Sequence, residues 1–387
     1  MNKLYKYIFF TILLLCFTFA FGEQRTALIQ DTPSDKDDKS ADSEKSDEDK
    51  AEDEEPQITT RIRKAINSGL SYLASQQNRD GSYGGSYDIA TCGLAGLAFV
   101  AGGHLPNRGE YAENVEKLVK HLLKVQNRDT GYYHSNNDSS RIHGHGYAGL
   151  FLAEILGMLT DKDLHDSVKS SIDKAAKLSA GSQTKDGGWG YIPQDETFDE
   201  GSTTITQIQF LRAARDAGMN IPKRKINNAI RYVYKCAMQT DYKGVDGKNH
   251  LGYTFKYSLS MNYNRSSYPL TAAAASVLQG TGIYEGEILE GALGWMRYYF
   301  NKYSDESADS IAMNWFYYAQ FYAAQAFWHS NDSRDWWKYY NKVANILVSM
   351  QNTSNGSWNS YYGNAYSTAI ATMILAIPDR FLPLFQK

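Results

Sequence analysis

The chain has 387 residues and a formal net charge of −3, with 42% hydrophobic and 13% aromatic residues, a composition typical of a globular protein with a large apolar core. This near balance of charge excludes the strongly basic surface that nucleic-acid-binding proteins rely on. Three cysteines are too few for a disulfide framework, so apolar packing must stabilise the fold.

The first 22 residues are typical of a secretory signal peptide. Lys3 and Lys6 precede an apolar run over residues 8–21, and the small residue Gly22 allows cleavage before Glu23. The run is shorter than the ~20 apolar residues of a membrane-spanning helix. We therefore expect a secreted or periplasmic protein without a transmembrane domain after signal cleavage; an uncleaved N-terminal anchor is the alternative.

Residues 23–57 have the composition of an acidic linker. Between residues 31 and 55 the chain has 13 aspartates and glutamates, four lysines and almost no large apolar side chains. Such a segment cannot bury enough apolar surface to offset the entropy lost on ordering, so we expect it to be disordered. The predicted organisation is a signal peptide at 1–22, a disordered linker at 23–57 and a folded domain at 58–387.

Amphipathic and strongly apolar stretches alternate through the predicted domain. In the first pair, apolar residues recur at helical spacing from Ile62 to Leu73, and an almost wholly apolar stretch follows over residues 89–101. A turn with a glutamine, a glycine and an aromatic residue joins the two stretches. The turns are Gln77, Gly81 and Tyr83; Gln126, Gly131 and Tyr132; Gln183, Gly187 and Trp189; Gln351, Gly356 and Trp358; and a degenerate copy from Gln239 to Tyr253.

This regular spacing indicates a repeat architecture. Each copy predicts an amphipathic outer helix, a turn and a buried inner helix, and the pattern gives six such helical hairpins. The last inner stretch, residues 369–377, is as apolar as the others, whereas an open solenoid has polar capping repeats at its ends. The sequence therefore predicts an all-α fold, an α/α toroid of six helical hairpins.

The turns resemble the Gln-x-x-x-Gly-x-Trp repeat of squalene and terpene cyclases. Over residues 58–387 the chain is similar to the α/α-toroid superfamily of these cyclases and the protein prenyltransferase β-subunits. It also resembles secreted bacterial proteins with prenyltransferase/squalene-oxidase-type repeats, through the segments at 315–318 and 382–384. The resemblance implies that the turns are structural and tie each hairpin to its neighbour.

In such a ring all inner helices begin at the same end, so the residues ahead of them converge on one rim. The candidate ligand-binding residues there are Asp88, Arg265, Tyr268, Asn314, Trp315, Tyr318 and Tyr366. The converging helix N-termini favour anionic ligands or anionic side chains. Aromatic residues 315–322 could contact an apolar or cationic group, and simple core packing is the alternative.

Four residues at this rim are catalytic candidates. Asp199 and Glu200 occupy the place of the proton-donating acidic cluster of squalene-hopene cyclases, although this chain has Asp-Glu-Gly-Ser-Thr instead of the cyclase pattern. Helix capping is the favoured alternative. His143 and His145 form the densest histidine site. They could share a metal on an extended segment, which the neighbouring glycines leave open, but they point apart on a helix. No third ligand is identifiable, so histidines satisfied at a helix start are favoured.

Zinc-dependent prenyl transfer is disfavoured. The segment from His250 to Phe255 resembles a prenyltransferase segment whose histidine faces the diphosphate, but the Asp-x-Cys pair that binds zinc in those enzymes is missing. We expect no metal and no cofactor.

The sequence leaves three functions open. The first is a non-catalytic toroid that binds an apolar or anionic ligand, such as an isoprenoid or another lipid, or a protein, at the rim. The second is a terpene-cyclase-like enzyme that uses an acidic residue at the mouth of the barrel. The third is a secreted polysaccharide lyase or hydrolase.

Overall fold

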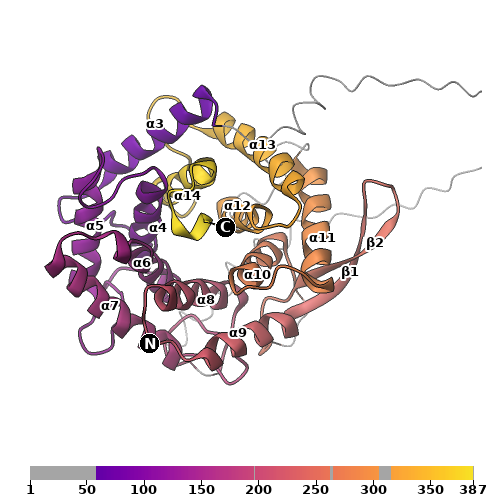
Figure 1. The fold of residues 1–387 in the computed structure, drawn as a ribbon, viewed down its shortest axis with the longest axis horizontal. Coiled ribbons are helices and arrows are strands. Elements are labelled where there is room, and N and C mark those ends of the chain that lie inside the picture. Colours follow the sequence, from indigo (N-terminus) through magenta and orange to yellow (C-terminus); the bar gives the residue numbers. More distant parts are fainter. Residues whose placement is uncertain (1–57, 196, 262–264, 305–314, 387) are drawn as a thin grey trace, which may run out of the picture. The chain divides into compact units, whose positions relative to one another are not determined.

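The computed structural model describes residues 58–386 apart from 196, 262–264 and 305–314. The predicted signal peptide, the acidic linker and Asn314 lie outside the described residues. Helices alternate between two concentric layers of one ring, as Figure 1 shows in the view down the ring. The prediction of an all-α toroid is confirmed, with one small β-hairpin added to the helices.

The outer layer consists of amphipathic helices that bury one face. These helices are α3 (Thr60–Gln76), α5 (Ala112–Val125), α7 (Lys162–Gly181), α9 (Lys223–Cys236), α11 (Glu287–Ser304) and α13 (Ser333–Met350). In α3 the buried residues recur every three or four positions, from Ile62 to Leu73, which is the single apolar stripe expected of a surface helix.

The inner layer consists of helices that are buried on nearly all sides. These are α4 (Asp88–Ala101), α6 (Arg141–Ile155), α8 (Gly201–Asp216), α10 (Tyr268–Gly280), α12 (Phe316–Trp328) and α14 (Asn364–Ala376). Every residue of α4 is buried. Small residues permit this density: a Cβ at Gly93 would lie 2.5 Å from the backbone of Tyr147 in α6. Neighbouring inner helices pack against each other around the ring, and α14 packs against α4 to close it.

The glutamine turns connect each repeat to the next outer helix by the same hydrogen bonds. In each of the four regular turns the glutamine Nε2 donates both to the carbonyl of the turn glycine and to a carbonyl in the next outer helix, over 2.8–3.2 Å. The outer-helix acceptors are Asn114 for Gln77, Ser171 for Gln126, Lys225 for Gln183 and Ala65 for Gln351. Because Ala65 belongs to α3, the last turn closes the ring on the first helix.

The turn glycines make the close approach possible. Gly187 has φ +99°, and a Cβ added to it would lie 2.4 Å from the carbonyl oxygen of Asn228 in the next outer helix. Gly81, Gly131 and Gly356 also have positive φ and would meet the backbone of Lys117, Lys174 and Ser68. In all four turns this contact lies three residues after the carbonyl that the glutamine binds. Only glycine combines this backbone conformation with such a short distance.

Two details of the repeat differ from the sequence prediction. In the second turn the buried aromatic residue is Tyr133, not Tyr132: Tyr133 is fully buried, and its hydroxyl lies 2.6 Å from Ser171 Oγ. In the fourth copy the chain forms an antiparallel hairpin of β1 (Ala237–Lys243) and β2 (Asn249–Phe255). There Gln239 donates to the Tyr253 hydroxyl, which donates to Glu287 of α11, so side chains replace the direct bond to the next helix.

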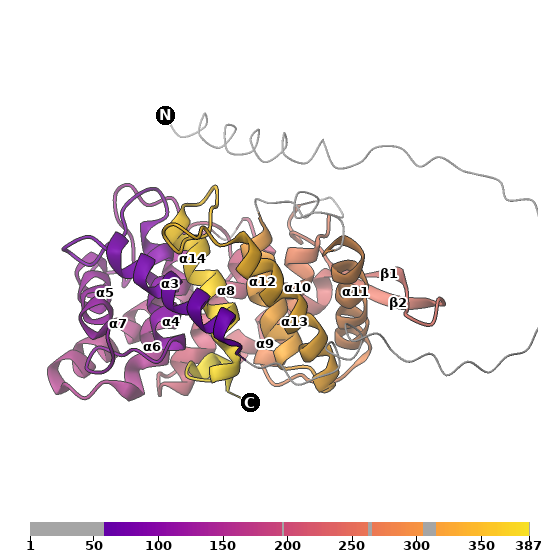
Figure 2. The same ribbon diagram turned by 90° about the horizontal axis from the view of Figure 1, so that it is seen from above.

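The C-terminal segment covers the end of the ring opposite the inner-helix N-termini. The Trp328 indole, at the end of α12, donates to the Phe385 carbonyl over 2.6 Å, and Glu154, near the end of α6, accepts the backbone N–H of Leu384 over 2.8 Å. Figure 1 places the C-terminus within the ring outline, and Figure 2 shows the segment at one end of the helices. Within the part of the chain described, no helix is long and apolar enough to span a membrane.

Candidate functional site

A cluster of aromatic side chains lies at the end of the ring where inner helices begin, which we call the mouth. Tyr362, ahead of α14, contacts Tyr87, ahead of α4, at a ring distance of 5.2 Å, and Trp315, ahead of α12, at 5.8 Å. Tyr361 and Tyr366 complete this mouth cluster. Tyr361 is 72% exposed, and the other four side chains are partly buried. The cluster therefore offers aromatic surface that solvent can reach.

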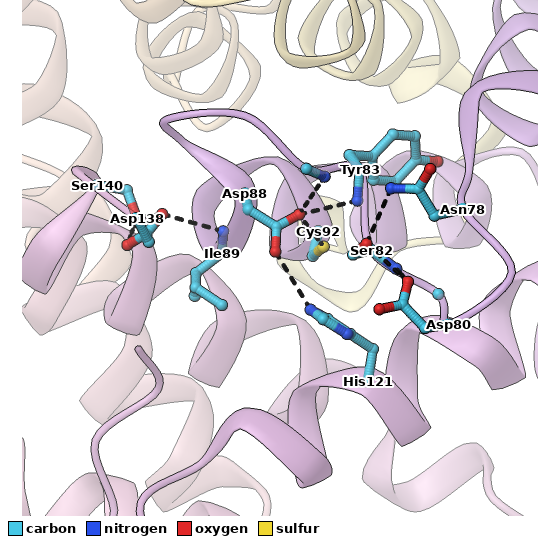
Figure 3. Close-up of polar contacts among 12 residues, drawn as sticks. Asn78, Asp80, Ser82, Tyr83, Asp88, Ile89, Cys92, His121, Asp138 and Ser140 are labelled. Carbon is cyan, nitrogen blue, oxygen red and sulfur yellow. Dashed lines mark hydrogen bonds and ion pairs between the residues drawn. The ribbon is translucent and has the colours of Figure 1, made fainter. Parts of the chain in front are cut away.

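Buried carboxylates at the mouth accept the backbone N–H groups of helix starts and turns. Asp88 Oδ1 accepts the N–H groups of Tyr83 and Gly84 over 2.8 and 2.7 Å (Figure 3). Asp138 accepts the N–H of Ile89, the second residue of α4, over 3.2 Å. These aspartates supply negative charge beside the positive end of α4. The sequence predicts anionic groups at this rim, and carboxylates of the protein itself occupy these positions.

Glu200 is the N-cap of α8 and is completely buried. Its two carboxylate oxygens accept the N–H groups of Ser202 and Thr203, both over 2.9 Å. The Ser202 hydroxyl donates to Glu200 and lies 2.9 Å from His143 Nε2, so a hydrogen-bonded chain links the glutamate to a partly buried imidazole. Burial raises the pKa of Glu200 to about 7. Glu200 therefore caps α8, and its raised pKa is also compatible with the role of a general acid.

The pKa of Glu200 predicts a specific pH dependence of stability. Because the pKa is raised from 4.5 to about 7 on folding, the folded state keeps a proton that the unfolded state loses in this range. The stabilisation is complete below about pH 4.5 and is lost as pH rises through 7, with a size of about 3 kcal/mol. In urea unfolding, the unfolding free energy of wild type, measured relative to that of Glu200→Gln, should fall by about this amount from pH 4.5 to 7.5. A difference that does not change with pH would contradict the raised pKa.

Asp199 connects α9 to the loop ahead of α10 by hydrogen bonds. Its carboxylate accepts the Tyr232 hydroxyl over 2.6 Å and the backbone N–H groups of Leu259 and Ser260 over 2.8 and 3.1 Å. The Ser258 hydroxyl is a fourth donor. These bonds hold the loop against α9 and give the carboxylate a structural role.

The two histidines of α6 have separate partners. His145 is fully buried: its Nδ1 accepts the N–H of Tyr133 over 3.2 Å, and its Nε2 faces Ser179 Oγ at 3.1 Å. His143 instead faces Ser202 and the ring of Tyr191. Burial lowers the pKa of both imidazoles to about 4, so both are neutral at physiological pH. They do not share a common ligand position.

The other rim candidates are divided between the mouth and the rest of the fold. Trp315 and Tyr366 belong to the mouth cluster, and Tyr318 lies buried in the first turn of α12. Tyr268 was expected to face the rim, but its ring stacks on Tyr299 of α11 at 5.2 Å, between the two helical layers. Arg265 is exposed in the loop ahead of α10. His250 lies on β2, where its Nε2 is 2.9 Å from Asp246 Oδ1, outside the inner layer.

Hydrogen bonds cross the interior of the ring between helices that are not neighbours in the inner layer. The hydroxyls of Tyr147 in α6 and Tyr322 in α12 are 3.2 Å apart. The amides of Gln209 in α8 and Gln325 in α12 are joined over 2.7 Å. All four side chains are buried. The interior is therefore bridged by polar groups at these levels.

Tyr87, Tyr361, Tyr362 and Asp138 are site residues that the sequence analysis missed. The tyrosines lie in the loops ahead of α4 and α14, so their position in the chain alone could have marked them as rim residues. The signal was hidden because 29 tyrosines are spread over the whole chain. Asp138 precedes α6 by three residues but accepts a bond from α4, a contact between repeats that no local pattern encodes.

At the level of sequence, no protein-family model and no curated protein matches this chain. Solved structures do match its fold. A type II terpene cyclase from Scytonema in complex with geranylgeranyl dihydroxybenzoate is 13% identical, with a TM-score of 0.51 over 83% of this chain and 98% of the cyclase. An inactive variant of an α-1,6-mannanase of Salegentibacter sp. in complex with α-1,6-mannotriose is 10% identical, with a TM-score of 0.55 over 81% of this chain and 98% of the mannanase.

A D-mannose isomerase is 11% identical, with a TM-score of 0.52 over 83% of this chain and 98% of the isomerase. These identities are too low to transfer an activity, and proteins with one fold carry unrelated functions. The chain therefore shares the α/α-toroid fold of these three proteins, which is the fold that the resemblance of its turns to the cyclase repeat predicts.

Proposed function

We propose that this protein is a non-catalytic α/α toroid that binds a ligand at its mouth, outside the cytoplasm. The observation that carries the proposal is the mouth cluster, in which three inner-helix starts supply five aromatic side chains, four of them in contact with the central Tyr362. Partly exposed tyrosine and tryptophan side chains combine a large apolar face with a polar tip, a combination enriched at binding surfaces. The N-terminal signal-like segment supports export.

A neutral, polyhydroxylated ligand such as an oligosaccharide suits this mouth best. Sugar rings present C–H groups to aromatic faces and hydroxyls to tyrosine hydroxyls. An anionic ligand is disfavoured, because Asp88, Asp138 and Glu200 already occupy helix starts and turns there. A long hydrocarbon entering the ring would have to separate the Tyr147–Tyr322 and Gln209–Gln325 pairs, at a cost of about 1–3 kcal/mol for each buried group left unpaired.

The proposal of a binding protein also rests on how the carboxylates are used. A glycoside hydrolase needs two carboxyl groups that flank the bond to be cleaved. In this protein, Asp199 accepts four hydrogen bonds from its own chain, and Asp88 and Asp138 accept backbone N–H groups. Glu200 alone combines a raised pKa with a hydrogen-bonded link to His143.

Calorimetric titration with neutral trisaccharides tests the proposed ligand class. We expect at least one of α-1,6-mannotriose, cellotriose and chitotriose to bind. Tyr362→Ala should weaken that binding by about tenfold or more, because it removes the ring at the centre of the cluster. Tyr284→Ala is the matched control, since Tyr284 is 45% exposed and lies after the C-terminal end of α10. Equal affinities for the two variants, or no binding by wild type, would refute the proposed site.

An enzyme that uses Glu200 as its acid is the second candidate, favoured by the raised pKa and the Glu200–Ser202–His143 chain. A type II cyclase would convert squalene or a geranylgeranyl compound, and a hydrolase or lyase would cleave the bound oligosaccharide. Product formation by wild type that is lost in Glu200→Gln would replace the binding proposal with the corresponding enzyme.

A further inference from the structure

Three side chains with metal-binding atoms meet between the inner and outer layers of the first repeat. Asp88 and Cys92 lie one turn apart on α4, and His121 reaches them from α5 (Figure 3). One ligand atom from each residue lies within 4.8 Å of the other two. All three residues are buried, with exposed fractions of 5%, 0% and 6%. The group lies beneath the turn that contains Tyr83.

The histidine in this group has no satisfactory hydrogen bond. Neither ring nitrogen of His121 makes one among the described residues, although the ring is buried. Its Nε2 faces Asp88 Oδ2 at 3.3 Å. A buried ring without a well-formed hydrogen bond is costly, and a bound ion would explain it. The weak contact of Nε2 with Asp88 is therefore the first indication of a further ligand.

The third turn shows how this place is filled by an ordinary hydrogen bond. His121 lies seven residues after Asn114, the residue that Gln77 binds, and Tyr232 lies seven residues after Lys225, the residue that Gln183 binds. The Tyr232 hydroxyl donates to the carboxylate of Asp199 over 2.6 Å. In the first repeat the corresponding distance, from His121 Nε2 to Asp88 Oδ2, is longer, at 3.3 Å, and the thiol beside it comes from the inner helix.

Cys92 shares the role of its counterparts with Asp88. In three other turns the N–H of the aromatic residue is accepted by an inner-helix side chain, namely His145, Thr204 or Thr368. In the first turn Asp88 Oδ1 accepts the N–H of Tyr83 over 2.8 Å, and the Cys92 sulfur makes a second contact with that N–H. The Cys92 thiol donates to the same Asp88 oxygen over 3.5 Å, a proton that a bound cation would replace.

The spacing and charge of these atoms suit a zinc-type dication. Tetrahedral zinc with bonds of about 2.0 Å to nitrogen or oxygen and 2.3 Å to sulfur places neighbouring ligand atoms roughly 3.3–3.5 Å apart. The distance of 3.3 Å from His121 Nε2 to Asp88 Oδ2 lies in this range, and one ligand atom of each of the three residues lies within 4.8 Å of the other two. One carboxylate, one thiolate and one neutral imidazole would neutralise the dication, as a buried site requires.

We propose that Asp88, Cys92 and His121 bind a zinc-type divalent cation that ties α4 to α5 beneath the first turn. Each ion displaces the Cys92 thiol proton to solvent and forms one metal–sulfur bond, and water completes the four ligands. Asp88 is already oriented, because the N–H groups of Tyr83 and Gly84 hold its other oxygen. The spacing differs from the Asp-x-Cys zinc pattern of the prenyltransferases, because Asp88 and Cys92 lie four residues apart on α4.

Cobalt is the direct probe of this site, because thiolate ligation gives it a charge-transfer band and tetrahedral geometry gives it strong visible bands. The full chain, reduced and stripped with a chelator, is titrated with Co²⁺ and then with Zn²⁺. We expect one cobalt per chain with a thiolate band, displacement by zinc, and a raised thermal midpoint with zinc. Cys92→Ala should abolish the band and weaken zinc binding by roughly 100-fold or more. A residue that only supports a metal ligand would cost less when it is replaced.

Cys236→Ala is the matched control, since Cys236 is the other buried free cysteine of the described domain and lies on α9. It should bind cobalt like wild type, and His121→Gln should lose binding while circular dichroism shows that the helices are kept. The proposal is overturned if wild type gives no thiolate band, if Cys92→Ala keeps the band, or if Cys236→Ala loses it.

Discussion

Gly356→Ala is expected to lower the free energy of unfolding by at least about 3 kcal/mol. The residue has φ +79°, and an alanine there costs about 1–2 kcal/mol in backbone conformation alone. Its Cβ would also lie 2.5 Å from the carbonyl oxygen of Ser68, so the last turn must move away from α3. That movement weakens the bonds of Gln351 to Ala65 and Gly356, which contribute about 0.5–1.5 kcal/mol each.

Gly282→Ala separates the two causes in the same urea-unfolding experiment. Gly282 has φ +94°, but nothing lies within 4 Å of a Cβ built on it, so its substitution carries only the conformational cost. Gly356→Ala should exceed it by about 2 kcal/mol. Equal losses for the two variants would mean that the contact between the last turn and the first helix does not stabilise the ring.

Asp199→Ala should cost about 3–5 kcal/mol of folding stability. The change removes the acceptor of four hydrogen bonds and leaves the Tyr232 hydroxyl and the N–H groups of Leu259 and Ser260 unpaired. Each buried donor left without an acceptor costs about 1–3 kcal/mol, and part of the loss is recovered if the loop opens to water. Urea unfolding at a pH above the ordinary range of aspartate measures the effect.

Asp195→Ala is the control in the same loop region. Among the described residues, Asp195 accepts the backbone N–H and the hydroxyl of Thr197, two residues away, and no other hydrogen bond, so its loss should cost less than about 1 kcal/mol. A loss of stability for Asp199→Ala no larger than that for Asp195→Ala would mean that Asp199 is held for another reason. That result would favour a catalytic role for Asp199 over a structural one.

The fold was predictable because its repeat is written in local patterns. Apolar residues at helical spacing mark the outer helices, continuous apolar stretches mark the inner ones, and the glutamine and glycine of each regular turn contact the next outer helix at a fixed register. The β-hairpin after α9 was not predicted, because Gln239 keeps its residue type while the chain around it pairs as strands. Tyr133 was missed because two adjacent tyrosines follow Gly131, and only packing decides which one is buried.

The site was less predictable because its contacts join separate repeats. The positions of Trp315 and Tyr366 at helix starts indicated the mouth correctly, since chain topology fixes where helix starts lie. The direction of the Tyr268 ring, toward α11, depends on aromatic partners that its own neighbours do not reveal. The same is true of Asp199, whose donors lie 33–61 residues away, and of His121, whose metal-binding partners belong to another helix.

Hydrogen–deuterium exchange of the full chain, with and without the trisaccharide that binds most tightly, shows whether the aromatic mouth is the ligand site. We expect the ligand to slow exchange at the helix starts of the mouth, residues 84–89, 315–318 and 361–367. Exchange at the β-hairpin and at the turns of the opposite end, residues 102–110 and 281–286, should not change. Slower exchange at those distant segments with none at the mouth would contradict the account.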